Sequence, residues 1–296
     1  MLQMIKDVFQ WKFDVAEFRT LITNGLHQPF PRIRAKYIMR DHSGLFVQIT
    51  IAYLVLIFAI KRLMRDRKPF DLSFFLMFWN NFLAFFSIYG SWVLMPVMWQ
   101  QIQSLGLYGC GCEGLSRMPP NAEYLMFLTV VSKAFELIDT IFLVLRKRPL
   151  IFLHWYHHVA TFLFFAFTYP TLSSQVRVGA IVNLFVHAFM YTYYFLRAME
   201  IRLSTRIAMT VTSLQLTQFV CFIYGCSLMY YALATDTYTC DTPLYVLHAT
   251  FILSISYFAL FINFFYKSYI QGRGKVTYQP KTIKKVRKIV KTVKKD

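Results

Sequence analysis

The sequence is dominated by seven apolar stretches, each long enough to cross a lipid bilayer as an α-helix. A transmembrane helix needs about 17–25 mostly apolar residues, because the hydrocarbon core is about 30 Å thick and each helical residue adds about 1.5 Å. We therefore predict an all-α integral membrane protein with seven transmembrane helices. They are expected at residues 44–60, 72–98, 123–145, 150–170, 176–196, 207–233 and 244–266.

The composition agrees with this class. Hydrophobic residues make up 57% of the chain and charged residues 16%, whereas a soluble domain carries roughly a quarter charged residues. Residues 100–121, between the second and third stretches, are expected to form a long loop rich in glycine. The segment 9–18 fits either a short interfacial helix or a surface arm.

The formal net charge is +18, and the cations are unevenly distributed among the loops between the apolar stretches. Cations gather in the loops after the first, third and fifth stretches and in the tail, and cation-rich loops stay in the cytosol. We therefore predict a lumenal arm at 1–42, a membrane domain at 43–267 and a basic cytosolic tail at 268–296, so the N-terminus is lumenal and the C-terminus cytosolic. The basic residues of the arm oppose this orientation. The topology accounts for the cations without nucleic acid, and they can also attract lipid headgroups or a phosphate-rich substrate.

One apolar stretch begins with three histidines in five residues. His154, His157 and His158 are spaced i, i+3 and i+4, so a helix places them on one face. Ionisable side chains in a membrane segment are costly unless they face a bundle interior or a cavity. A lone histidine there is most often a core residue, but three on one face point to metal ligation or to acid–base and nucleophilic chemistry.

Three other stretches carry polar side chains at helical spacing. They are Lys133, Glu136, Asp139 and Thr140, then Asn183, His187, Tyr191 and Tyr194, then Thr212, Gln215 and Gln218. Lys133 and Glu136 can form an ion pair, which lowers the penalty of burying them. On the predicted topology each of four stretches brings a polar residue to a level roughly 10–14 Å from its cytosolic end. These residues are Asp139, His157, His187 and Gln215. We predict a polar chamber inside a bundle, open to the cytosol, with an apolar tunnel beyond it.

The polar residues form four motifs. They are Lys133-x-x-Glu136-x-x-Asp139-Thr140, His154-x-x-His157-His158, Asn183-x-x-x-His187-x-x-Met190-Tyr191 and Thr212-x-x-Gln215-x-x-Gln218. In order and spacing this set resembles the ELO family of very-long-chain fatty acid elongases, over about residues 62–266. The histidine motif is similar to that of the branch that elongates saturated and monounsaturated chains. It lacks the Gln-x-x-x-His-Val-x-His-His form that is usual in the polyunsaturated branch.

The resemblance implies a multi-pass protein of the endoplasmic reticulum membrane, with six of its seven helices enclosing a substrate tunnel closed on the lumenal side. It implies a very-long-chain 3-oxoacyl-CoA synthase, an acyltransferase that joins a long-chain acyl-CoA to malonyl-CoA and releases CO2 and CoA. No cofactor and no metal are then expected, because the CoA thioesters are substrates. The expected partners are membrane lipid and the reductases and dehydratase of the elongation cycle.

Histidine can act as a base, a donor or a nucleophile near neutral pH, and no cysteine falls in the predicted chamber. We therefore expect His157 to carry the acyl group in a two-stage mechanism, with His187 as its partner. A one-step reaction in which the histidines act only as acid and base stays open. The residues expected to orient the rings are His154, His158, Asp139 and Asn183. Those expected to bind substrate are Lys133, Glu136, Thr140, Tyr191, Tyr194, Gln215 and Gln218, with Arg146, Lys147, Arg148 and, more weakly, Lys281 to Lys288 at the CoA phosphates.

Two other classes share parts of this pattern. Membrane di-iron desaturases and hydroxylases also use a His-x-x-His-His box, but their sites resemble arrays of eight or more histidines. This chain has seven, and His27, His42 and His248 lie away from the predicted chamber. A seven-helix receptor or transporter would explain the topology but not the convergence of polar residues at one level.

The five cysteines divide between loops and spans. Cys110, Cys112 and Cys240 fall in loops that are lumenal on the predicted topology, where a disulfide can persist. A bond from Cys240 to Cys110 or Cys112 would stabilise the fold by about 4–5 kcal/mol in the chain-entropy model; three unpaired thiols are the alternative. Cys221 and Cys226 are expected to be free thiols inside the sixth span.

Overall fold

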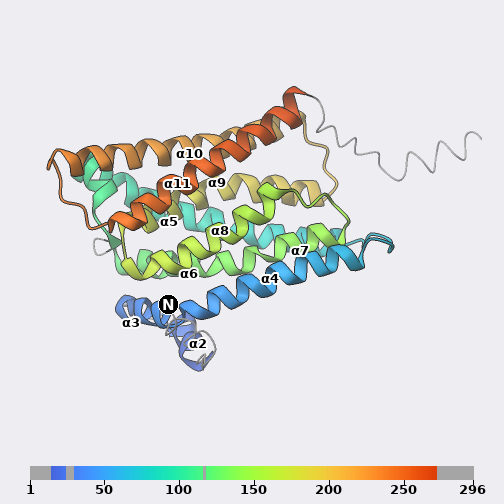
Figure 1. The fold of residues 1–296 in the computed structure, drawn as a ribbon, viewed down its shortest axis with the longest axis horizontal. Coiled ribbons are helices and arrows are strands. Elements are labelled where there is room, and N and C mark those ends of the chain that lie inside the picture. Colours follow the sequence, from blue (N-terminus) through green and yellow to red (C-terminus); the bar gives the residue numbers. More distant parts are fainter. Residues whose placement is uncertain (1–14, 25–29, 116–117, 272–296) are drawn as a thin grey trace, which may run out of the picture. The chain divides into compact units, whose positions relative to one another are not determined.

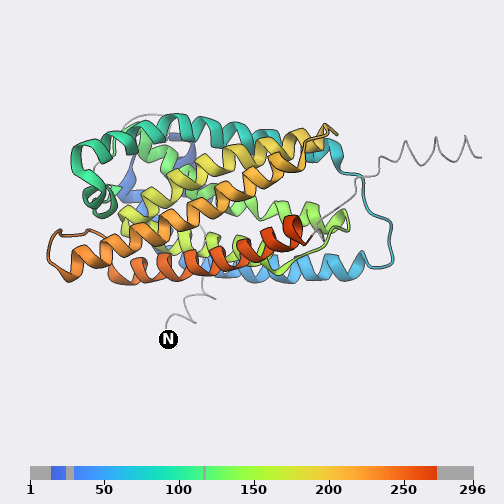
Figure 2. The same cartoon turned by 90° about the horizontal axis from the view of Figure 1, so that it is seen from above.

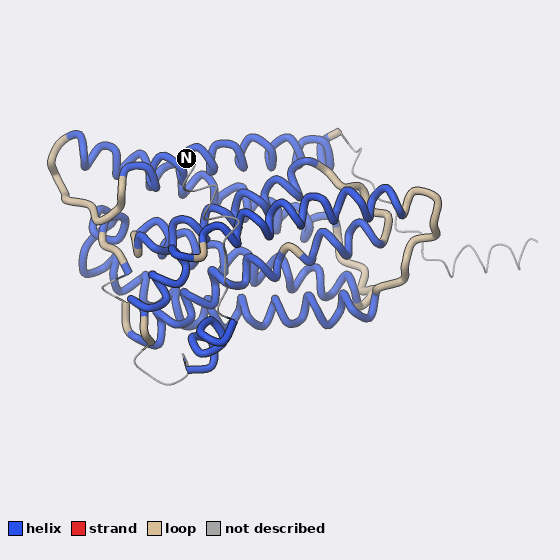
Figure 3. The backbone as a smooth tube through the Cα atoms, turned by 60° about the horizontal axis from the view of Figure 1, so that its bottom comes forward, coloured by secondary structure: helices blue, strands red, loops and turns tan. Residues whose placement is uncertain are grey.

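The computed structural model describes residues 15–24, 30–115 and 118–271, and these residues form helices and connecting loops without a strand (Figures 1 and 3). The α-helices are α2 (Val15–Asn24), α3 (Arg32–Asp41), α4 (Ser43–Leu63), α5 (Ser73–Cys112), α6 (Pro120–Glu136), α7 (Ile138–Leu145), α8 (Phe152–Thr168), α9 (Ser174–Ala198), α10 (Thr205–Ala234) and α11 (Leu244–Phe265). A 3-10 turn, η2 (Tyr169–Thr171), follows α8, and a π-helical turn, η3 (Tyr266–Ile270), follows α11. The described residues up to Phe261 form one compact unit, and those from Ile262 belong to a second.

Five helices of the described chain are long and apolar enough to cross a membrane: α4, α5, α9, α10 and α11 with η3. Two predicted spans are shorter. The stretch 123–145 is divided into α6 and α7 at Leu137, where the N–H of Thr140 bonds the carbonyl of Leu137 (3.3 Å) in a tighter i, i+3 turn, and α8 has 17 residues. An all-helical protein with membrane-spanning helices is thus confirmed, with five spans by length and composition.

The predicted loop at 100–121 is wrong over its first part, because α5 continues to Cys112. Its residues after Trp99 are mostly Gln, Ile, Ser and Leu, and nothing among them stops a helix before the first glycine. The helix is interrupted only at Gly106, with φ 70° and ψ −176°. Glycine reaches this conformation without the steric penalty of a side chain, so the helix axis can bend there and continue to Cys112.

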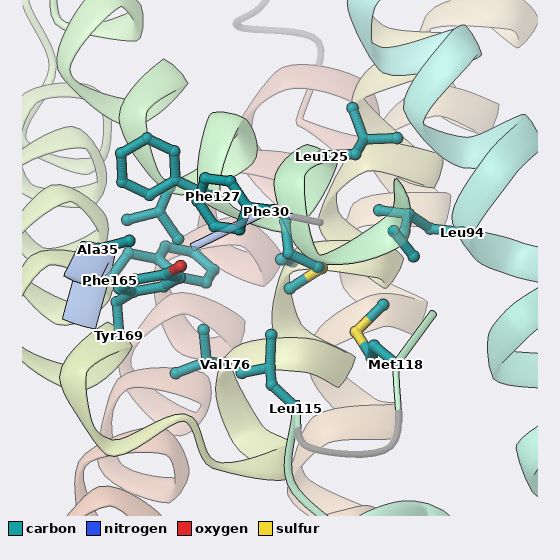
Figure 4. Packing of buried hydrophobic residues seen from close by; sticks show 14 of the residues in the cluster. Phe30, Ala35, Leu94, Leu115, Met118, Leu125, Phe127, Phe165, Tyr169 and Val176 are labelled. Carbon is teal, nitrogen blue, oxygen red and sulfur yellow. The ribbon is translucent and has the colours of Figure 1, made fainter. Parts of the chain in front are cut away.

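Within the unit that ends at Phe261, the helices lie side by side, and α9 runs along both α5 and α10 (Figure 2). Gly90 lets α5 and α9 approach closely: a Cβ at this position would lie 2.8 Å from Cδ1 of Leu184. The largest buried apolar cluster joins α5, α6, α8 and α9 to α2 and α3, and includes Leu94, Phe127, Phe165 and Val176 (Figure 4).

A disulfide and a set of buried hydrogen bonds stabilise one end of this unit. A disulfide joins Cys112 at the end of α5 to Cys240 in the loop before α11, 128 residues later. Cys110, the other candidate for Cys240, is a free and buried thiol. The guanidinium of Arg177, wholly buried at the start of α9, donates to Gln101 Oε1 and to the carbonyls of Cys110 and Glu113. Cys221 and Cys226 are free, as predicted.

At the other end of the bundle, hydrogen bonds to backbone carbonyls connect two loops. Lys147 Nζ donates to the carbonyls of Arg65 (2.9 Å) and Arg67 (3.0 Å). The N–H of Phe70 donates to the carbonyl of Leu145 (3.1 Å). The loops after α4 and after α7 therefore lie together, at the end of α5 opposite to the disulfide.

Candidate active site

A buried ion pair lies at the centre of the candidate site. Lys133 and Glu136 are one helical turn apart on α6 and are 2% and 5% exposed. Lys133 Nζ donates to Glu136 Oε1 (2.7 Å) and to Oδ1 of Asn183 on α9 (2.6 Å). Ser132 Oγ adds a third donor to the carboxylate, at 3.2 Å. Burial of an ion pair is tolerated when the remaining lone pairs are bonded in this way.

The same network fixes His187, which is buried one turn after Asn183 on α9. Because Asn183 Oδ1 accepts from Lys133, the Nδ2 amide group must face Nε2 of His187, 3.1 Å away. An amide nitrogen only donates, so Nε2 is the acceptor and a neutral ring carries its proton on Nδ1. Nδ1 lies 3.8 Å from Glu136 Oε2. Asn183 therefore orients the His187 ring at Nε2, and the Glu136 carboxylate lies near the other ring nitrogen.

A second branch of the network holds Asp139. Its carboxylate accepts from Trp79 Nε1 (2.5 Å) and from the hydroxyl of Tyr191 (2.9 Å), and the Tyr191 ring meets the His187 ring edge-on with centroids 5.2 Å apart. Asp139 thus acts on His187 through Tyr191 in this structure. The next residue, Thr140, accepts from the hydroxyl of Tyr53 on α4 (2.6 Å). Trp79 and Tyr53 did not stand out in the sequence, because each is one of many aromatic residues in the predicted spans.

The three clustered histidines project from α8. The His154 and His158 rings have centroids 4.6 Å apart, and the His157 and His158 rings 5.6 Å apart. The His154 Nε2 atom is buried without a hydrogen-bond partner. Tyr257 on α11 lies 5.0 Å from the His157 ring, and its hydroxyl reaches the His157 carbonyl (3.5 Å). The three half-buried rings therefore contact one another on one face of α8, which is the face that their spacing predicted.

An apolar cavity of about 60 Å³ lies between α8, α9, α10 and α11. His157, Asn183 and Gln218 are among its lining residues, so the histidine cluster and the Lys133 network meet at one space. The Oε1 atom of Gln218 is buried without a hydrogen-bond partner. The rest of the wall is largely aromatic and aliphatic. Polar groups and apolar space thus meet at this cavity, while the opening to the cytosol and the tunnel beyond it stay predictions.

Other predicted residues lie away from this cavity. Gln215 Nε2 donates to Sδ of Met190 (3.2 Å), and Gln218, one turn later on α10, lines the cavity instead. Tyr194 is 45% exposed, 6.5 Å from the Tyr191 ring. At the loop after α7, Lys147 is bonded to backbone carbonyls, and Arg148 is exposed. The segment Lys281 to Lys288 lies outside the described residues.

Among the described residues, no group of three or more His, Cys, Asp and Glu side chains is arranged to hold a metal ion. The geometry gives a buried imidazole, His187, whose Nε2 faces the Asn183 amide, and a second imidazole, His157, at a cavity wall. Around them lie a lysine and an amide that can donate to an oxyanion. These groups can support acyl transfer or carbanion chemistry on an apolar substrate.

Apolar helices around a buried Lys–Glu–Asn–His network define an integral membrane protein with a polar network in its interior. Comparison with known proteins gives the family. The model described as ELO: GNS1/SUR4 family matches residues 38–277. "Long chain fatty acid elongase 1" of Caenorhabditis elegans is 38% identical over 279 residues, which cover 94% of this chain and 96% of the relative. "Very long chain fatty acid elongase 3" of Mus musculus is 36% identical over 229 residues, 77% and 83% of the two chains. The chain belongs to the ELO family, and the resemblance seen in its motifs is confirmed.

Proposed function

We propose that this protein is the condensing enzyme of fatty acid elongation, joining a long-chain acyl-CoA to malonyl-CoA to give a 3-oxoacyl-CoA, CO2 and CoA. The observation that carries the proposal is the meeting of His157 with the Lys133–Asn183–His187 network at one apolar cavity. Membership of a family whose relatives are named fatty acid elongases supports it.

The apolar cavity is the proposed place of the acyl chain. An apolar cavity of about 150 Å³ takes up benzene, so the 60 Å³ found here holds only a few carbon atoms. Binding of a long chain therefore requires the lining side chains, such as Phe165 and Phe222, to move apart. We expect the thioester to lie at the polar end, beside His157.

In the proposed first stage a ring nitrogen of His157 attacks the acyl thioester carbon. The new N–C bond replaces the C–S bond, and CoA leaves as the thiolate, which takes up a proton. In the second stage malonyl-CoA loses CO2, and the resulting enolate attacks the acyl carbon. The C–N bond then breaks, which frees the 3-oxoacyl-CoA and returns His157 to its starting form.

The enolate oxygen needs hydrogen-bond donors. Asn183 lines the cavity, and its amide has a second N–H besides the one given to His187. Lys133 polarises this amide through Oδ1. We propose that Asn183, polarised by Lys133, donates a hydrogen bond to the enolate oxygen. His187 then supplies the proton that the CoA thiolate takes up in the first stage, and regains it from solvent.

We further propose seven membrane spans over residues 43–267, with α6–α7 and α8 completing the five longer helices, in the endoplasmic reticulum membrane. The loops with Lys147 and Arg65 would face the cytosol, where Arg146 and Arg148 meet CoA phosphates and where the reductases and dehydratase of the cycle would take over the product. The Cys112–Cys240 end would be lumenal, which agrees with the oxidising lumen. Protection of Cys240 peptides and cleavage of loop peptides at Arg65–Lys68 by protease added to sealed microsomes would test this orientation.

The function is tested with purified protein, palmitoyl-CoA and labelled malonyl-CoA. Products two carbons longer are expected, and His157→Ala and His187→Ala should abolish them. His248→Ala is the matched control, because His248 is exposed and bonds Tyr230 away from the cavity. Normal turnover in either site variant would refute its assignment. Intact-mass analysis with acyl-CoA alone separates the mechanisms: an acyl adduct that requires His157 supports the two-stage route, and its absence favours the one-step route.

A further inference from the structure

A second apolar cavity lies outside the candidate active site. It is bordered by α4, by the faces of α6 and α8 that turn away from the polar network, and by α2 and α3. Its volume is about 270 Å³, more than four times that of the active-site cavity. His42 is the only lining residue that is not hydrophobic.

Water cannot fill this space, because a buried water needs two to four polar partners. His42 directs Nδ1 to its own helix, at the carbonyl of Ile38 (2.8 Å). An apolar cavity of about 150 Å³ takes up benzene, so in proportion this one accommodates roughly ten carbon atoms. The chemistry and the volume both fit a segment of an aliphatic chain.

The cavity is partly open at the surface of the bundle. Phe135 lines it and is nevertheless 51% exposed, so this side chain marks an edge. The helix α4 forms one wall of the cavity. Its opposite, outward face exposes Ile51, Val55 and Phe58. In a membrane-spanning helix that face contacts lipid, so an acyl chain can enter sideways from the bilayer.

Cations lie close in sequence to the lining residues of α2 and α3. Each lies within four residues of a lining residue, and they are Arg19, Arg34, Lys36 and Arg40. Asp41 pairs with Arg40 and offsets one of them. The helix α3 is held in place by the ion pair of Arg32 with Glu123 on α6. A basic helix beside an apolar space is suited to an anionic headgroup with its chain inserted.

We propose that this cavity binds one acyl chain of an anionic phospholipid, whose phosphate rests against the cations of α3. The lipid would fill the space behind the wall that carries the reaction centre. On α6, Val130 and Ala134 face the cavity while Lys133 belongs to the polar network; on α8, Phe162 faces it while His157 lines the active site. A bound chain would thus support both helices from behind, and the proposal is independent of the reaction assigned to the other side.

Photolabelling tests the site directly. The full-length protein is placed in phosphatidylcholine nanodiscs with a trace of phosphatidylserine or phosphatidylcholine that carries a diazirine on one acyl chain, then illuminated, digested and analysed by mass spectrometry. Label is expected in peptides 45–49 and 130–135, more strongly from phosphatidylserine. Absence of label from both peptides would overturn the proposal, as would stronger labelling by a diazirine fatty acid than by phosphatidylserine, which would identify a free acid as the occupant.

Two variants fill the cavity. Ala134→Phe should lower labelling of these peptides at least about fivefold, and Ile49→Trp provides the same change from α4 should the first fail to fold. Ala52→Phe is the matched control, because Ala52 lies on the exposed face of α4. Unchanged labelling in a folded filling variant would place the lipid elsewhere.

The headgroup contact has its own test. Replacing Arg34, Lys36 and Arg40 together by Gln should remove the preference for phosphatidylserine, by about fivefold for each cation that contacts the phosphate. The same replacement of three exposed cations at and after the end of α4, Arg62, Arg67 and Lys68, is the control. Equal labelling by the two lipids in the wild-type protein would refute the anionic headgroup.

Discussion

Replacement of Lys133 by Met tests whether the buried ion pair holds the reaction centre together. Lys133 is 2% exposed and forms its two bonds at 2.7 and 2.6 Å, to Glu136 and Asn183. Met has a similar length but cannot donate, so the Glu136 carboxylate would remain buried without its counter-charge. Removing one partner of a buried pair destabilises a protein by about 3–5 kcal/mol. We expect Lys133→Met to unfold at a clearly lower temperature than the wild-type protein and to lose activity.

The double variant Lys133→Met/Glu136→Gln separates charge from packing. Without the carboxylate no unpaired charge is left, so the double variant should recover most of the lost stability while staying inactive. The assay is thermal unfolding in one detergent at fixed lipid content, with Lys61→Met as the control, since Lys61 is exposed at the end of α4 and should change stability by less than about 0.5 kcal/mol. A double variant no more stable than Lys133→Met, or a Lys133→Met protein as stable as wild type, would refute the reasoning.

Three further predictions follow from contacts at other places. Trp79→Phe removes a donor from half-buried Asp139 and should destabilise the protein by about 1.5–3 kcal/mol, whereas Trp92→Phe, at an 81% exposed side chain, should not. Equal unfolding temperatures for the two variants would contradict the role of the indole N–H. Cys240→Ser opens a bond across 128 residues and should lower stability by at most about 5 kcal/mol in the chain-entropy model, measured against Cys221→Ser; no difference under non-reducing conditions would count against it. Arg148→Ala should raise the KM for both CoA substrates and leave kcat unchanged. Lys147→Ala removes the hydrogen bonds to the loop carbonyls of Arg65 and Arg67 and should instead lower stability. An unchanged KM in Arg148→Ala would show that Arg148 does not contact CoA.

The sequence predicted contacts within a helix better than contacts between helices. The Lys133–Glu136 pair follows from i, i+3 spacing alone, and the depth of each polar residue follows from the rise of a helix. Rotation about the helix axis does not follow from either. Gln215 and Gln218 point about 60° apart around α10, so their spacing could not decide which of them faces the cavity. In the structure Gln218 lines it and Gln215 bonds Met190.

Two donors to the network were missed for a related reason. Trp79 and Tyr53 lie in aromatic-rich spans, where rings usually contact lipid or core, and their partners on α7 are distant in sequence. A signal was nevertheless present, because an indole N–H inside a membrane needs an acceptor. The extension of α5 to Cys112 was missed because glycine was taken to end the helix, whereas Gly106 only interrupts it.

The disulfide also has a consequence for how the chain is made. Cys112 is synthesised 128 residues before Cys240. At a synthesis rate of about 5–20 residues per second, its partner follows roughly 6–26 s later. When Cys240 is made, the neighbouring thiol of Cys110 is a second candidate for the same bond. Arg177 is synthesised before Cys240, and in the folded protein its guanidinium lies 4.0 Å from the Cys110 sulfur. If α9 docks on α5 before Cys240 emerges, Cys110 is already buried and the order of synthesis favours the observed Cys112–Cys240 pairing.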